Sequence, residues 1–270
     1  MNGLLAAPWA FVVRDFRLAV SYKAGFVFEV VGSLLNVLVF FFMSEFFGNA
    51  LGSQIARYGG NYFSFVIIGI AFTSYLGVGL SGISRQLRDA QLMGTLELML
   101  ISPTRLPVTL LSSAIWAHVM ASVAVTTYFV AAALLGLDLQ GANIPLALLA
   151  LAIAIVSFNS IGLLAAAAVI VFKQGNPVDW AVRAGSIVLA GVFYPATVLP
   201  EGLRTVAQAL PLTHALEVVR GALLLGAGPD TVGGSLLILC GLTALYLPLG
   251  LLACHVAVRI AQRDGSLSTY

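Results

Sequence analysis

The sequence predicts an all-α integral membrane protein with six transmembrane helices, and three observations support this prediction. The 270 residues are 60% hydrophobic and only 9% charged, with a mean hydropathy of +1.02, whereas soluble domains carry roughly 25% charged residues. Several apolar runs exceed the roughly 20 residues that cross a bilayer as a helix, which excludes an outer-membrane barrel. Basic residues gather in alternate connections between these runs.

The first 23 residues predict an amphipathic helix that lies in the membrane interface. Apolar residues, including Trp9 and Phe16, follow helical spacing, while Arg14 and Arg17 occupy another face. The charged residues also interrupt the apolar run that a signal peptide would need.

Residues 24–270 are predicted to form one membrane domain of six spans. No soluble domain or low-complexity linker interrupts it. The expected spans are about Ala24 to Phe47, Tyr62 to Ser84, Leu106 to Leu137, Ile144 to Phe172, Ala181 to about Leu199, and Leu236 to Val258.

The distribution of basic residues predicts the orientation of the spans. With the N-terminus inside, ten of the thirteen basic residues face the cytoplasm, which agrees with the positive-inside rule. Both termini are therefore expected in the cytoplasm, and the protein in the plasma (inner) membrane. The far side holds only Arg57, Arg204 and Arg220.

Residues 85–105 form an unusually long cytoplasmic connection between the second and third spans. It has room for a short helix, with Thr95 as the expected N-cap and Pro103 at its end. Three residues at i, i+3 and i+4 give this helix an apolar face that lies on the headgroups, packs under its own bundle, or contacts a soluble partner. They are Leu96, Met99 and Leu100.

Residues 195–230 are expected to form short helices that dip into the outer leaflet and return. Three prolines cut this apolar stretch into pieces too short to cross a bilayer: Pro195, Pro200 and Pro211. Thr213 is the expected N-cap of the last piece. Non-helical backbone at this depth is tolerated against protein or a water-filled cavity, so the region is expected to cap a pathway.

The motifs of several enzyme classes are missing. The chain has no GxxxxGK[ST] sequence for binding ATP and no Cys or His cluster with metal-ligand spacing. Its three histidines are scattered, and its net charge of +2 is too small to indicate nucleic-acid binding. We therefore expect no catalytic site, metal or cofactor in this chain.

Two segments resemble the ABC type-2 exporter permeases. The first is RDAQLMGTLELMLISPTRLP, where charged residues precede a GTLE-like turn and a Ser-Pro pair. The second is GVFYPATVLPEGLRTVAQALPLTHALEVVRGALLLG, with an aromatic-proline turn, an LP, a P-x-T and an R-G pair. With the amphipathic N-terminus and six spans, the resemblance covers nearly the whole chain.

The resemblance implies a transport subunit that pairs with a second copy of itself and with two cytoplasmic ATPase subunits, which would bind ATP and Mg²⁺. The 85–105 segment would then be the coupling helix. Its expected contacts with the ATPase are Arg88, Gly94, Thr95, Leu96, Glu97, Met99 and Leu100. Glu97 is expected to stabilise the helix N-terminus or to pair with Arg14 or Arg17.

Polar and aromatic residues in the spans suggest where a pathway would run. Four polar residues either face a pathway or satisfy one another within the chain: Glu29, Asn36, Thr73 and Ser74. Three residues form either an outer gate or an ordinary proline-terminated span: Phe193, Tyr194 and Pro195.

The leading prediction is a permease subunit that exports an amphipathic substrate, such as a lipid-linked compound, a drug or a glycan. An ion- or proton-coupled secondary transporter is the alternative, although few ionisable residues lie in the spans. A membrane scaffold that transports nothing is the third possibility.

Overall fold

The computed structural model describes residues 9, 12–17, 23–59, 61–94, 106–172 and 177–263. Within this part of the chain the secondary structure is helical, with no strand. The elements are α2 (Lys23–Ile55), η1 (Ala56–Tyr58), α3 (Tyr62–Gly77), η2 (Val78–Gly82), α4 (Ile83–Leu92), α6 (Leu106–Leu134), α7 (Ile144–Phe172), α8 (Pro177–Leu189), η3 (Ala196–Val198), α9 (Glu201–Gln208), α10 (Pro211–Leu224) and α11 (Pro229–Arg263).

Among the described residues, five stretches of helix are long and apolar enough to cross a membrane. They coincide with the first, second, third, fourth and sixth predicted spans. Their bounds are Ala24–Phe46, Tyr62–Ala90, Val108–Leu134, Ile144–Val171 and Pro229–Ile260. The second of these stretches is continuous through α3, the π-helix η2 and α4.

The fifth predicted span is shorter than the apolar pattern indicates. α8 has 13 residues, which is about 20 Å of helix against a hydrocarbon core of about 30 Å. The chain leaves the helix after Leu189 and turns at Gly191, whose φ of +83° favours glycine. The prediction of six continuous spans is therefore not met within the described residues, which contain five.

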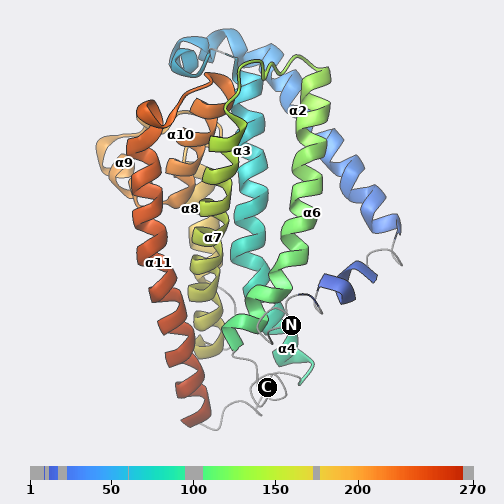
Figure 1. The fold of residues 1–270 in the computed structure, drawn as a ribbon, viewed down its shortest axis with the longest axis vertical. Coiled ribbons are helices and arrows are strands. Elements are labelled where there is room, and N and C mark those ends of the chain that lie inside the picture. Colours follow the sequence, from blue (N-terminus) through green and yellow to red (C-terminus); the bar gives the residue numbers. More distant parts are fainter. Residues whose placement is uncertain are drawn as a thin grey trace.

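α7 lies at the centre of the bundle, where α11 makes the most extensive contact with it and α10 packs against both (Figure 1). Glycines allow the backbones to approach closely. A Cβ at Gly250 in α11 would lie 2.5 Å from the Ser160 carbonyl oxygen in α7, and a Cβ at Gly162 in α7 would overlap the Gly79 carbonyl oxygen of η2.

Two short helices, α9 and α10, lie at the end of the bundle opposite α4 (Figure 1). The prediction that Thr213 is the N-cap of the second is wrong: Leu210 is the N-cap, and Pro211 occupies the first turn, where a missing N–H costs nothing. Thr213 instead donates its hydroxyl to the Ala207 carbonyl at 2.7 Å and so ties α10 to α9. Their predicted insertion into the outer leaflet stays a prediction.

Close contact between α7 and η2 leads to a stability prediction. Gly162→Ala should destabilise the protein by about 1–3 kcal/mol, because the added methyl group meets backbone rather than a flexible side chain. Gly241→Ala in α11 is the matched control, since no atom lies within 4 Å of a Cβ there. Thermal unfolding of the purified protein compares the two. Equal unfolding temperatures would show that the contact is not as close as described.

Candidate functional site

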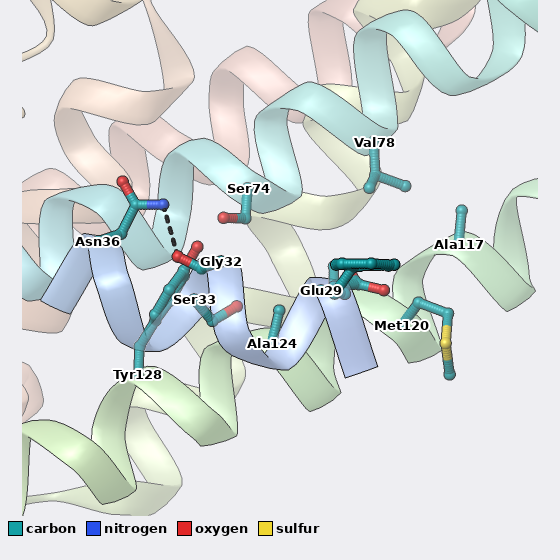
Figure 2. A pocket seen from close by; sticks show the side chains of 12 residues that line it. Glu29, Gly32, Ser33, Asn36, Ser74, Val78, Ala117, Met120, Ala124 and Tyr128 are labelled. Atoms are coloured by element: carbon teal, nitrogen blue, oxygen red, sulfur yellow. Dashed lines mark hydrogen bonds between the residues drawn. The ribbon is translucent and has the colours of Figure 1, made fainter. Parts of the chain in front are cut away.

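A pocket of about 540 Å³ lies between α2, α3, η2 and α6 (Figure 2), within the roughly 300–1,000 Å³ range of small-molecule sites. Its lining is apolar apart from one carboxylate, an amide and three hydroxyl groups. The lining residues are Phe28, Glu29, Gly32, Ser33, Asn36, Ser74, Val78, Ala117, Met120, Ala121, Ala124 and Tyr128. The pocket is thus an amphipathic surface on a membrane-spanning bundle.

The polar groups of α2 reach this pocket because of their helical spacing. Glu29, Ser33 and Asn36 are separated by four and three residues and therefore share one face. Figure 2 shows Glu29 near Met120 at one end of the pocket, and Asn36 near Tyr128 at the other. The Asn36 amide donates to the carbonyl of Gly32 at 3.0 Å, which holds its side chain along the helix.

The predicted pathway residues of α3 are placed differently from one another. Ser74 lines the pocket and donates to the Ile70 carbonyl at 3.3 Å. Thr73 donates to the same carbonyl at 2.7 Å and is not part of the pocket lining. Of the four polar residues proposed from sequence, the structure brings Glu29, Asn36 and Ser74 together.

The three residues of the predicted outer gate lie in the turn between α8 and η3. The Phe193 ring stacks on Phe40 of α2, with centroids 5.8 Å apart. The Tyr194 hydroxyl donates to the Val188 carbonyl and so folds back on α8. Pro195 is buried and begins η3. The turn therefore contacts the first span through Phe193.

Arg220 of α10 is the most completely buried charged side chain of the described residues, with 2% exposure. Its guanidinium donates to the carbonyl oxygen of Phe65 through Nε (3.1 Å) and Nη2 (2.9 Å). It also donates to Gly191 through Nη1 at 2.7 Å and to Val192 through Nη2 at 2.9 Å. One side chain thus joins α10, α3 and the turn after α8.

The surroundings of Arg220 are shaped to accept a planar cation. The guanidinium carbon lies 3.4 Å from the centre of the Phe65 ring, where the ring quadrupole attracts a cation. A Cβ at Gly69 would lie 2.8 Å from Nη2 and 2.5 Å from the Val192 carbonyl oxygen. From the sequence alone, Arg220 is predicted only as a basic residue on the far side of the membrane. The sequence feature that could have indicated its burial is the position of this charge inside the apolar run ALEVVRGALLLG.

A second group of charges lies one helical turn away. Arg57 Nη2 is 3.8 Å from a Glu217 carboxylate oxygen and 2.5 Å from the Tyr58 hydroxyl. Ser235 donates to the other Glu217 oxygen at 3.1 Å and so connects α11. Burial raises the pKa of the Tyr58 phenol above its ordinary value.

His118 of α6 and Asn159 of α7 contact each other in the middle of these two helices. His118 Nδ1 contacts the Ala114 carbonyl at 2.8 Å, which assigns the proton to that nitrogen. Its Nε2 lies 3.4 Å from the Asn159 amide nitrogen. No group of His, Cys, Asp or Glu in the described ranges is arranged to hold a metal ion.

Most of the predicted coupling segment lies outside the described residues, including Thr95, Leu96, Glu97, Met99 and Leu100. Arg88 is exposed on α4, and Gly94 is exposed in a left-handed conformation with a φ of +68°. α4 therefore ends where a glycine lets the chain change direction.

Residues 12–17, within the predicted N-terminal helix, are helical in the structure. Phe16 packs edge-to-face on Trp116 of α6 at 5.7 Å between ring centroids, and Arg14 pairs with Asp15 at 2.7 Å. Trp9 and Arg17 are exposed. The predicted position in a membrane interface, like the predicted pairing with Glu97, stays a prediction.

Comparison with known proteins finds similarity to a family model and to two nodulation proteins. Residues 93–224 match the family model described as ABC-2 type transporter. Nodulation protein J of Rhizobium leguminosarum bv. trifolii is 27% identical over 218 residues, covering 80% of this chain and 81% of that protein. Nodulation protein J of Rhizobium meliloti (strain 1021) is 25% identical over 257 residues, covering 94% of this chain and 91% of that protein.

The burial of Arg220 leads to a prediction about stability. Arg220→Met should cost about 1–3 kcal/mol for each carbonyl group left without a donor. Arg204→Met is the matched control, because Arg204 also donates to two carbonyls but lies exposed on α9. Thermal unfolding of the purified variants measures both effects. A loss at Arg204 as large as that at Arg220 would contradict the role of burial.

Proposed function

We propose, from the ABC-2 type transporter domain that residues 93–224 carry, that this chain is the membrane-spanning permease subunit of an ATP-driven exporter. The sequence has no P-loop, so the energy of ATP must come from separate ATPase subunits. Two copies of the chain would surround a pathway, with two ATPase subunits bound on the cytoplasmic side. The domain match is the observation on which this proposal chiefly depends.

The pocket between α2, α3 and α6 supports an amphipathic substrate. Apolar residues make up most of its lining, while the Glu29 carboxylate and the Asn36 amide offer fixed polar contacts. A lipid-linked compound, a drug or a glycan with an apolar part would match this mixture. The pocket would then form part of the pathway wall.

The exposed face of α2 supports pairing with a second copy. Only 11% of its most apolar window is buried within the chain, and large side chains such as Phe28 (76%) and Phe46 (87%) are exposed. Glu29 and Asn36 are exposed on the same helix, and polar groups in a span normally face protein or water rather than lipid. A neighbouring protomer would cover these groups.

The proposed coupling segment provides the first test. Leu100→Asp should release the ATPase subunits on a pull-down, because a charge would enter an apolar contact at a cost of several kcal/mol. Glu97→Gln should retain an active ATPase but reduce ATP-driven movement of a fluorescent amphiphile into inside-out vesicles. Val206→Asp places the same charge on an exposed residue of α9, at the opposite end of the bundle, and should retain the ATPase. Full ATPase retention by Leu100→Asp would disprove the coupling role.

The outer turn provides a second test. Phe193→Ala removes the stack on Phe40, and an aromatic pair contributes about 0.5–1.5 kcal/mol, or roughly two- to twelvefold in an equilibrium. A closed gate should therefore open more often, which basal ATPase activity and leak of a small dye from proteoliposomes would report. Tyr194→Phe keeps the ring and loses only the hydroxyl contact with Val188, so it serves as the control. Unchanged leak in Phe193→Ala would argue against a gate.

A further inference from the structure

Ser81, Asp179 and Arg183 form a polar cluster that joins the second span to α8. The Ser81 hydroxyl donates to Asp179 Oδ1 at 2.7 Å and accepts from Arg183 Nη2 at 2.7 Å. Ser81 itself is 5% exposed. Both contacts involve a charged partner, and such hydrogen bonds are about twice as strong as neutral ones. We call these three residues the Ser81 cluster.

The local sequence places the two charged partners where one serine can contact both. Asp179 and Arg183 are four residues apart and therefore lie on one face of α8. Asp179 is in the first turn, where the helix dipole favours a negative charge. Gly77 leaves room for the guanidinium, since a Cβ there would lie 3.0 Å from Arg183 Nη2, which also reaches the Gly77 carbonyl at 3.4 Å.

Ser81 lies within η2, the π-helical segment Val78–Gly82 of the second span. A π-turn inside an α-helix is rare and occurs often at functional sites. Arg85 of α4 donates through Nε to the Ser81 carbonyl at 3.0 Å, so the backbone of Ser81 is also tied to the helix that follows. Both ends of this residue therefore contact charged side chains, one from α4 and two from α8.

The Ser81 cluster lies between two elements that lead to opposite ends of the bundle. On one side, α4 continues for 10 residues to Leu92 and is followed by Gly94 and the proposed coupling segment. On the other side, α8 ends at Leu189 and is followed by the turn whose carbonyls hold Arg220 and whose Phe193 contacts α2. The Ser81 cluster therefore connects α4 and α8, two short helices that are far apart in the sequence.

We propose that the Ser81 cluster is the link through which movement of α4 reaches the outer turn along α8. This inference rests on the proposed function, because it requires an ATPase that moves the coupling segment. Ser81 is then a positioning residue, since it acts on Phe193 through α8 and contacts no substrate. The buried hydroxyl between two charges keeps η2 and α8 moving together, and the π-turn is where the second span changes shape.

The test measures movement of the outer turn in the complete complex of the permease with its co-expressed ATPase. Spin labels at Val198→Cys in η3 and Phe46→Cys in α2 report the distance across the gate, because both residues are exposed. Cys240→Ser and Cys254→Ser remove the native thiols from the parent protein. Adding ATP with vanadate to the parent complex should change this distance.

Ser81→Ala should abolish the ATP-dependent distance change while the ATPase stays bound and continues to hydrolyse ATP. Ser84→Ala is the matched control. Ser84 is a buried serine three residues later, 2% exposed, whose hydroxyl donates to the Leu80 carbonyl of its own helix turn. Its substitution should leave the distance change intact, and Ser81→Thr, which keeps the hydroxyl, should preserve it too.

Asp179→Asn provides a second variant that does not depend on the packing around Ser81. It keeps the shape of the side chain and removes the charge. The ATP-dependent distance change should therefore be smaller than in the parent complex, as it should be in Ser81→Ala. A normal distance change in Ser81→Ala, or in Asp179→Asn when Ser81→Ala is unstable, would overturn this inference and leave the proposed function intact. A parent complex without bound ATPase would instead contradict the proposed function, and this inference with it.

Discussion

A buried guanidinium holds together the end of the bundle that lies opposite α4 (Figure 1). The turn after α8 leaves backbone carbonyl groups without helical partners inside an apolar environment, where an unpaired polar group is costly. Arg220 donates to Gly191 and Val192 in that turn and to Phe65 in α3. The short length of α8, the glycine at position 69 and the placement of Phe193 all depend on this side chain having room to reach three carbonyls.

The same principle explains the contacts around η2, the π-helical segment of the second span. There Arg85 donates to the carbonyl of Ser81, and the Ser81 hydroxyl contacts two charged side chains of α8. The Ser81 cluster contacts the first two turns of α8, and the turn held by Arg220 follows its C-terminal end. In the coupling that we propose, α8 would move as one body, because polar contacts hold both of its ends.

The packing around α7 differs from the polar contacts of Arg220 and of the Ser81 cluster. α7 is held against α11 and η2 by close backbone contact at Gly250 and Gly162, without charged groups. In a membrane the hydrophobic effect does little to bring helices together, so van der Waals contact between small residues supplies the attraction. α7 is therefore the packed centre of the bundle, whereas α2 and α11 each leave most of their apolar windows exposed within the chain.

The sequence by itself determined the helical class of the protein and the positions of the five long apolar helices among the described residues, because an apolar run of sufficient length has only one stable form in a bilayer. The ends of two of these helices lie beyond the predicted spans: α2 continues to Ile55, and α11 begins at Pro229 and continues to Arg263. The sequence also determined that Glu29 and Asn36 share a face, since helical spacing alone decides this. Only the tertiary structure decided that Ser74 lines the same pocket and Thr73 does not, that α8 ends at Leu189, and that Arg220 is buried. Hydropathy measures the preference of a segment for lipid. The placement of Ser74 depends instead on how the helices pack, and the burial of Arg220 depends on which distant backbone carbonyls lie within hydrogen-bonding distance.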